Sequence, residues 1–467
     1  MLIEFRVKNF KSFKELNKFT LVKGKQRFFE ERIGHVDKLS VLKFSGIFGA
    51  NASGKSNLVR AIKIMQFIVT HNSVPIDAMN EYFKLSSECE NKPTYFEVLI
   101  SIGEDIYTYG FEVNLKTWKI ETEWLFKLHY KTDKTINETK IFDRLNGEIE
   151  FSSEKDADDR LKVYREDVKL FQNNLFLSHV GRNGFLVDKT NKIMKEILNV
   201  YNWFLTSLSV LYSGEPFVTP EFVHNLNTEE ISKLLSSLDT GIKYVELQEV
   251  DEIDFKKDFY TTGTTLNDIL RTFESQRFIL NNGRKLTPTA LLRTPNDYWV
   301  IKYNDNKLSF SRLVFYHDVD KRVPFMLGNE SDGTLRLFEL SGALLNKEND
   351  RTLIVDELDR CLHPMLTVEF VKLFLKKASN EQDRSQLIVT THESHLLDLD
   401  LLRRDEIWFV VKKEGESSIY SLETYNVRFD KIIDKAYFEG RFDGVPVFES
   451  AFFPENVIYE NKWWVFT

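Results

Sequence analysis

A glycine-rich segment that ends in a lysine and a serine is the part of the chain best suited to chemistry. It reads Gly49-Ala50-Asn51-Ala52-Ser53-Gly54-Lys55-Ser56 and fits the pattern GxxxxGKS. Glycines let the backbone approach a phosphate closely, and consecutive amides at a helix N-terminus favour its negative charge. Lys55 would reach the outer phosphates and the Ser56 hydroxyl would bind Mg²⁺. This phosphate loop predicts binding of ATP with Mg²⁺, through Asn51, Ala52, Ser53, Gly54, Lys55, Ser56 and Asn57.

Two adjacent acids follow an apolar run near the C-terminal end. The run Leu353-Ile354-Val355 leads into Asp356-Glu357. Two carboxylates at the end of a buried strand are costly without a cation, so we prefer a metal site to an exposed turn. Asp356 is predicted to bind the Mg²⁺, and Glu357 to orient and deprotonate an attacking water.

A histidine follows the next apolar run. Val389-Thr390-Thr391 leads into His392, and His395 is a competing candidate three residues later. In a parallel sheet, neighbouring strands end at one edge, so His392 is predicted to lie on the γ-phosphate side. The bland alternative is an ordinary surface or core histidine.

A serine-glycine segment, Glu330 to Arg336, precedes a predicted helix. Ser331 suits the N-cap position, and Gly333 keeps the approach to the helix N-terminus open to an anion. By itself this pattern indicates a capped helix at least as strongly as an anion site.

The elements that must position these residues alternate between strand and helix. Apolar residues alternate over 3–8 and run together over 45–48, 352–355 and 387–390, whereas helical spacing begins at Asn57 and recurs over 366–374. Residues 95–100 and 107–113 predict a hairpin. The expected fold class is α/β, with a mixed sheet flanked by helices.

Composition predicts an ordinary folded protein. The 467 residues carry 42% hydrophobic and 29% charged residues, and no apolar run is long enough to cross a bilayer. Cys89 and Cys361 are far apart and outside any CxxC pair, so neither a disulfide framework nor a zinc site is expected. We expect a cytoplasmic protein, most simply a bacterial one, with no membrane partner.

Charge argues against a general nucleic-acid surface. Lys and Arg number 63 against 71 Asp and Glu, giving a net charge of −8. The lysine-rich stretch 116–140 is interrupted by acids, so we interpret it as a solvated face, with a nucleic-acid or partner surface as the alternative.

With these motifs in order, the chain resembles ATPases with an ABC-type P-loop core that are not transporters, the group of RecF, SMC and OLD proteins. The resemblance implies that Ser331, Gly333 and Thr334 contact the γ-phosphate held by a second subunit, in a homodimer or a higher homo-oligomer. It implies that Asn9, Lys11 and Ser12, with Arg6, lie beside the nucleotide, and that Asp359 lies in a dimer-contacting loop. The long arms of SMC proteins have no counterpart in the sequence.

Several segments look like a bacterial subfamily of AAA family ATPases of the AAA15 type: residues 44–63, 120–125, 234–242, 356–364 and 440–446. Such proteins are often found with a TOPRIM-type or HNH nuclease or a toxin, in anti-phage and abortive-infection systems such as PARIS, Septu and AbiL. By analogy, the resemblance implies an ATPase that regulates or scaffolds such an effector, with DNA or a phage protein as a further partner.

Four parts are expected: an N-terminal ATPase lobe over 1–125, a mainly helical insertion over 126–300, a C-terminal ATPase lobe over 301–412, and a tail over 413–467 that packs on the core. Two other functions compete with effector control. One is a RecF-like DNA-repair ATPase that binds duplex DNA directly. The other is a self-contained nuclease with Asp318, Asp320 and Glu330 as metal ligands, although a turn is the simpler interpretation of the two aspartates.

Overall fold

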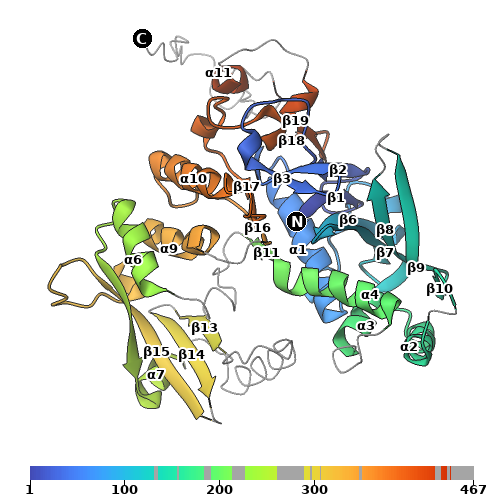
Figure 1. Ribbon diagram of the computed structural model, residues 1–467, viewed down its shortest axis with the longest axis horizontal. Coiled ribbons are helices and arrows are strands. Elements are labelled where there is room, and N and C mark those ends of the chain that lie inside the picture. The colour runs from blue at the N-terminus through green and yellow to red at the C-terminus, as the bar shows by residue number, and fades with distance from the viewer. Residues whose placement is uncertain are drawn as a thin grey trace, which may run out of the picture.

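The computed structural model describes residues 1–130, 135–154, 157–183, 191–212, 227–259, 289–294, 297–304, 307–345, 350–425, 433–438 and 442. Their strands form three larger sheets and one small one (Figure 1). A six-stranded sheet and a seven-stranded sheet enclose one long helix, and a four-stranded sheet forms a lobe at one side.

The six-stranded sheet carries the predicted motifs. Its order is β11 (Leu208–Leu211), β16 (Thr352–Val355), β17 (Gln386–Thr390), β5 (Phe44–Phe48), β18 (Ile407–Lys413) and β19 (Glu416–Ser421). All strands but β19 run parallel. Side chains alternate between two cores, so Ile47 faces α1 (Lys55–His71) whereas Phe44 and Phe48 face α10 (Pro364–Ala378). The apolar runs are therefore buried on both faces.

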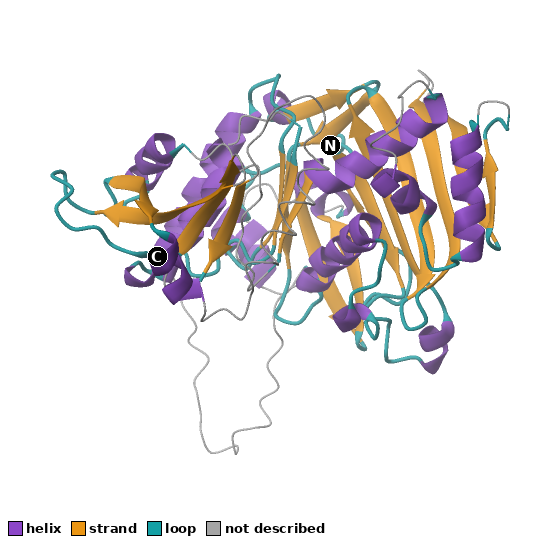
Figure 2. Ribbon diagram, turned by 90° about the horizontal axis from the view of Figure 1, so that it is seen from below, coloured by secondary structure: helices purple, strands orange, loops and turns teal. Residues whose placement is uncertain are grey.

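The seven-stranded sheet is antiparallel and packs on the other side of α1. Its order is β10 (Glu148–Phe151), β9 (Ile136–Leu145), β8 (Lys119–Tyr130), β7 (Asp105–Asn114), β6 (Thr94–Ile102), β1 (Leu2–Lys8) and β2 (Asn17–Thr20). Its inner side chains share one apolar core with α1, α3 (Phe176–Asn183) and α4 (Lys192–Asn202). Figure 2 shows these helices lying along the sheet, with α2 (Asp159–Leu170) near β10. A small ribbon of β3 (Ile33–Val36) and β4 (Leu39–Leu42) completes this part.

In the described residues, the lobe consists of a four-stranded antiparallel sheet and three helices. Its strands are β12 (Tyr244–Val250), β15 (Lys307–Tyr316), β14 (Tyr298–Asn304) and β13 (Thr289–Arg293), with α7 (Glu252–Phe259) on one face. Helices α6 (Thr228–Ser237) and α9 (Asp332–Leu345) pack on the other face. Further along α9, Leu340 and Ala343 join the core of α10, so α9 connects the lobe to the six-stranded sheet (Figure 1).

The predicted strands at 3–8, 45–48, 352–355 and 387–390, the helix after the phosphate loop and the hairpin of β6 and β7 are confirmed, as is the α/β fold class. The stretch 126–300 contains the helices α2, α3, α4, α6 and α7, but the sequence missed its strands. Strand β11 lies inside the insertion that was predicted to be mainly helical, and it extends the parallel sheet beside β16. A run of four residues is too short for the spacing of its apolar residues alone to distinguish a strand from a helix.

The limits between the four predicted parts remain a prediction, and strands cross all three of them. Strand β8 spans 125, β14 spans 300 and β18 spans 412. Of the predicted tail, β19 belongs to the six-stranded sheet, whereas most residues after 425, including nearly all of the segment 440–446, lie outside the described part.

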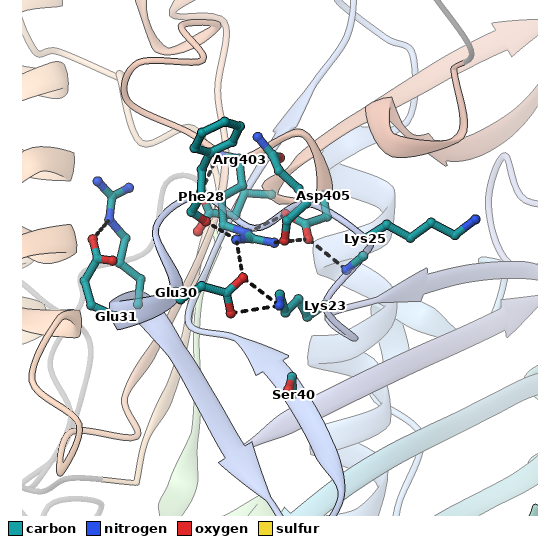
Figure 3. A network of polar contacts seen from close by, with 12 residues as sticks. Lys23, Lys25, Phe28, Glu30, Glu31, Ser40, Arg403 and Asp405 are labelled. Carbon is teal, nitrogen blue, oxygen red and sulfur yellow. Dashed lines mark hydrogen bonds and ion pairs between the residues drawn. The ribbon is translucent and has the colours of Figure 1, made fainter. Parts of the chain in front are cut away.

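A buried arginine fastens the segment after β2 to the start of β18 (Figure 3). Arg403 donates to both oxygens of Asp405 at 2.8 and 2.7 Å and to the carbonyls of Gln26 and Phe28. Glu30 lies 3.9 Å from the guanidinium and pairs with Lys23 at 2.7 Å. Arg403 has no exposed surface, so removing one partner would leave a buried charge without its hydrogen bonds.

The lysine-rich stretch is neutralised where it is described. Lys116 pairs with Glu90, Lys119 with Glu121, Lys127 with Asp105 and Glu196, and Lys140 with Glu150. These contacts favour the solvated charged face over a nucleic-acid surface. Both cysteines are free thiols, and no helix in the described ranges has the length and apolar character to cross a membrane.

Candidate functional site

The phosphate loop connects β5 to α1 at the edge where the parallel strands end. Gly49 and Gly54 have φ angles of 151° and 118°, in the region that favours glycine. A β-carbon at Gly49 would collide with the Val410 carbonyl, and one at Gly54 would lie 2.5 Å from the Ser417 hydroxyl. Ala52 also has a positive φ of 62°. The loop is thus held in one shape by neighbouring strands.

Lys55 begins α1 and is folded back over the loop. Its ammonium donates to the carbonyls of Gly49 at 2.7 Å and Ala50 at 3.1 Å, and only 5% of the residue is exposed. Burial lowers the pKa of Lys55 to about 8, and the nearby carboxylates of Asp356, Asp359 and Glu357 oppose this shift. The lysine and the acidic strand end are therefore electrostatic neighbours, as the sequence predicted.

Two serine hydroxyls and one side-chain amide support the phosphate loop. Ser417 on β19 donates to the Ser53 carbonyl at 2.5 Å, and its hydroxyl lies 2.7 Å from that of Ser12. The Asn57 amide also donates to Ser12, at 2.7 Å. The sequence predicted Ser12, Ser53 and Asn57 at the nucleotide, but it gave no signal for Ser417, which lies 362 positions (417 − 55) after Lys55, the first residue of α1. Ser12 and Asn57 thus support the loop through side chains.

Thr390 locks the acidic strand end. Its hydroxyl donates to Asp356 Oδ1 at 2.6 Å and accepts the Glu357 amide at 2.8 Å. Asp356 is fully buried, and Glu357 has a φ of 51°, a left-handed conformation that a non-glycine residue rarely adopts. The register of β16 beside β17 brings Thr390 to this position. In the sequence, Thr390 stands out only as part of the run before His392.

His392 lies on the same edge and remains exposed. Its amide donates to the two oxygens of Asp359 at 3.2 and 3.3 Å. Partial burial and the positive charge of Lys55 lower the pKa of His392, so the imidazole is neutral at pH 7. The competitor, His395, is held by Glu393 at 2.5 Å. His392 is therefore the histidine that faces Lys55 and the acids.

The serine-glycine segment caps α9 and touches the acidic turn of its own chain. The Ser331 hydroxyl accepts the Thr334 amide at 3.1 Å, as in an N-cap, and lies 2.9 Å from the Thr334 hydroxyl. A β-carbon at Gly333 would lie 2.6 Å from the Cys361 carbonyl. The described hydrogen bonds of Ser331 stay within its own helix and do not reach the phosphate loop.

Arg336 on the same helix joins the two acidic residues. Its guanidinium donates to the carbonyl oxygens of Asp356 at 3.1 Å and Glu357 at 3.0 Å, and 9% of the residue is exposed. The sequence showed Arg336 only as the end of the serine-glycine segment. Arg336 therefore fastens helix α9 to the acidic turn.

The turn that follows β1 serves partly to hold other segments of the chain in place. The Asn9 amide donates to the carbonyls of Cys89 and Lys92, each at 2.9 Å, and its oxygen accepts the Phe83 amide at 3.1 Å. Lys11 pairs with Glu81 at 3.1 Å and keeps 29% of its side chain exposed, and Arg6 pairs with Glu4 and Glu97. These contacts give no support to Asn9 as a nucleotide ligand, because its side chain is used to hold the segment 83–93.

The proposed nuclease ligands have separate partners. Asp318 accepts the Arg322 amide at 3.0 Å, Asp320 pairs with the Arg322 guanidinium, and Glu330 pairs with His317 at 2.9 Å. Among the described residues, no group of three or more His, Cys, Asp or Glu side chains could hold a metal. The turn interpretation is therefore favoured.

The donors at the phosphate loop fit Mg²⁺ bound together with a nucleotide. Ser56 begins the helix next to Lys55, and the buried Asp356 carboxylate is among the charges that act on Lys55. A hydroxyl and a single carboxylate are hard oxygen ligands, and Mg²⁺ usually takes one or two carboxylates and completes its shell with phosphate oxygens and water. The glycine cradle leaves room for those phosphates.

The phosphate loop, the acidic strand end and the parallel strands define a P-loop nucleotide-binding core of the α/β class. The model of the family described as "AAA domain, putative AbiEii toxin, Type IV TA system" matches residues 44–398, and the chain belongs to that family. A comparison with curated proteins gave no match.

Solved structures similar to the chain include SMC heads. A structure of an SMC head bound to the C-winged helix domain of ScpA is 16% identical with a TM-score of 0.36, covering 90% of this chain and 97% of that one. The SMC head domain from Thermotoga maritima is 15% identical with a TM-score of 0.36, and the match covers 90% of this chain and 98% of that one. A third structure is an SMC head with an extended coiled coil, bound to the C-terminal domain of ScpA derived from Pyrococcus furiosus. It is 16% identical with a TM-score of 0.34, and the match covers 90% of this chain and 96% of that one. At these scores the likeness carries no detail of the site.

Replacing Thr390 with valine should destabilise the acidic turn. Thr390→Val keeps the volume but leaves the Glu357 amide and a buried Asp356 oxygen without the hydroxyl, so we expect a loss of about 1–3 kcal/mol in the free energy of unfolding. Thr367→Val is the matched control, because the Thr367 hydroxyl is fully buried with no hydrogen-bond partner. Urea unfolding of both variants measures the effect, and equal losses would contradict the role of Thr390.

The buried lysine predicts a pH dependence of stability. Folded Lys55 has a pKa of about 8, against an ordinary value of 10.5. Between these values the unfolded chain binds more protons, so the free energy of unfolding should rise with pH. Lys55→Met keeps the alkyl stem but cannot titrate. From pH 7 to about pH 10, the wild type should gain about 2–3 kcal/mol relative to this variant. A difference that stays constant in urea unfolding would show that Lys55 is not desolvated.

Proposed function

We propose that the chain is a Mg²⁺-dependent ATPase that hydrolyses ATP to ADP and phosphate. The observation that carries this proposal is the meeting of Lys55, Asp356, Glu357 and His392 at one edge of the parallel sheet. Lys55 would exchange its loop carbonyls for the outer phosphates, and Ser56 and Asp356 would hold Mg²⁺. Mg²⁺ supplies charge neutralisation at the phosphates when bound.

Glu357 and His392 would act on the attacking water and the γ-phosphate. The turn that Thr390 and Arg336 fix presents Glu357 next to the buried Asp356. Glu357 is the proposed base that orients and deprotonates the water. His392, neutral at pH 7 because its pKa is lowered, can donate a hydrogen bond to the γ-phosphate.

A second copy of the chain would complete the site. The hydroxyl of Ser331 remains at an exposed helix N-terminus, and its hydrogen bonds in the described structure are local. Such a terminus favours an anion, so Ser331, Gly333 and Thr334 of one subunit would bind the γ-phosphate held by the other. Because Arg336 ties α9 to the acidic turn, closure of a dimer on one site would act on Asp356 and Glu357 of the neighbouring site.

We also propose that this ATP-driven dimer controls an effector protein, a nuclease or toxin, in anti-phage defence. The family description, which names an AbiEii toxin and a Type IV TA system, supports a role in this kind of system. The separate partners of Asp318, Asp320 and Glu330 argue against a nuclease centre at these residues. The AAA15 type and the PARIS, Septu and AbiL analogies remain part of this proposal.

Mixing two inactive variants tests the shared site. Lys55→Ala should lose ATP binding, and Ser331→Arg should bind ATP but place a bulky cation where the partner's γ-phosphate would lie. Each should be inactive alone, whereas mixed dimers contain one site with an intact Lys55 and an intact Ser331. We expect the mixture to recover phosphate release. A mixture as inactive as its components would contradict the shared site.

Glu357→Gln separates ATP binding and dimer formation from hydrolysis. This variant keeps the phosphate loop and Ser331, so it should bind ATP, turn over slowly and accumulate a dimer that gel filtration detects. Wild-type turnover by Glu357→Gln would refute its assignment as the base.

Salt dependence separates effector control from direct DNA binding. The net charge of −8 and the paired lysines of 116–140 predict that the purified chain does not bind duplex DNA electrostatically. We expect no change in the anisotropy of a labelled duplex at about 50 mM salt. Binding that falls steeply by about 200 mM salt would support the RecF-like alternative instead.

A further inference from the structure

Three side chains from distant segments form a continuous chain of hydrogen bonds behind the phosphate loop. Asn57 lies in the first turn of α1, Ser12 follows β1, and Ser417 lies on β19. The Asn57 amide lies 2.7 Å from the Ser12 hydroxyl, which lies 2.7 Å from the Ser417 hydroxyl. Ser417 in turn lies 2.5 Å from the carbonyl oxygen of Ser53 in the loop. Both Ser12 and Ser417 are buried, so bulk water does not compete for these contacts.

The chemistry of the groups at its two ends fixes the direction of this chain. A carbonyl oxygen can only accept a hydrogen bond, so the single hydroxyl proton of Ser417 is directed at Ser53. Ser12 must then donate its own proton to Ser417, while its oxygen accepts from the Asn57 amide. Every bond therefore points toward the loop, and hydrogen bonds aligned in this way strengthen one another.

The bond from Ser417 fixes the orientation of the peptide group between Ser53 and Gly54. This peptide is trans, so its N–H points opposite to its C=O. The C=O faces Ser417, and a β-carbon on Gly54 would also lie 2.5 Å from the Ser417 hydroxyl and 3.0 Å from that of Ser12. In the described part of the chain, the Gly54 amide donates to no backbone carbonyl. It therefore points away from both serines and is available to an anion on the other side of the loop.

We propose that Ser417 is a positioning residue that aims the Gly54 amide at the phosphates of a bound nucleotide. The proposal rests on the proposed function, because it requires a nucleotide at the loop. An amide that is oriented in advance binds an anion more tightly, since less order has to be gained on binding. Without the Ser417 hydroxyl, the buried Ser53 carbonyl would lose its donor, and rotation of the peptide toward another donor would turn the Gly54 amide away from the phosphates.

The binding of two ligands by variants of the full-length chain tests this role. Ser417→Ala should raise the Kd by about tenfold for both a non-hydrolysable ATP analogue and inorganic pyrophosphate, because the Gly54 amide acts on phosphate oxygens. Ser421→Ala is the matched control, since it removes a buried hydroxyl from the same strand that accepts the Glu423 amide at 3.1 Å. This control should keep both wild-type Kd values. Isothermal titration calorimetry with Mg²⁺ measures each protein.

Ser12→Ala tests the direction of the hydrogen-bond chain. It removes the donor to Ser417 but leaves the bond from Ser417 to Ser53, so both Kd values should rise by only about twofold. In the Ser417→Ala background the same change should have no further effect, because Ser12 acts on the loop through Ser417.

Three results would overturn the role of Ser417 and leave the ATPase proposal standing. They are unchanged Kd values in Ser417→Ala, an equal rise in Ser421→Ala, and a rise for the ATP analogue without one for pyrophosphate. Wild-type Kd values in Ser12→Ala, or effects of Ser12→Ala and Ser417→Ala that simply add, would overturn the directed chain. Failure of the wild type to bind the analogue would overturn both proposals.

Discussion

The enclosure of α1 between two sheets is the constraint on which the rest of the structure depends. One side of the helix packs against the seven-stranded sheet, and Ile354, Ile388 and Trp408 of the parallel sheet close the other side. Because β5 leads into α1 through the phosphate loop, fixing the helix and the strand also fixes the loop between them. Close packing of this kind permits only small movements of the loop.

Polar contacts then set the finer position of each functional group. Hydroxyls from Ser12, Ser417 and Thr390 lie behind the loop and the acidic turn, and each is within hydrogen-bonding distance of a second segment of the chain. These groups are buried, so leaving one unpaired would cost about 1–3 kcal/mol. Burial of Lys55, by contrast, is destabilising, because it disfavours the charged ammonium. An anion bound at the loop, such as a phosphate, would therefore stabilise the charged form of Lys55.

Helix α9 connects the acidic turn of the candidate site to the surface of the chain. Its N-terminus carries Ser331, its body packs on the four-stranded sheet, and Arg336 contacts the acidic turn. A subunit that contacts Ser331 would therefore act on a rigid unit, and the four-stranded lobe would move with it.

Local pattern was enough to predict the phosphate loop, the acidic strand end and His392, since each follows an apolar run that only a buried strand explains. The spacing of apolar residues also predicted α1 and the hairpin of β6 and β7. It could not place β11, whose pairing with β16 is decided by a strand more than 140 positions later. Nor could it find the supporting roles of Ser417 and Arg336, because these residues lack a motif and act through neighbours that are distant in the chain. Chemistry at the site is encoded locally, whereas the support that makes it rigid arises from tertiary packing.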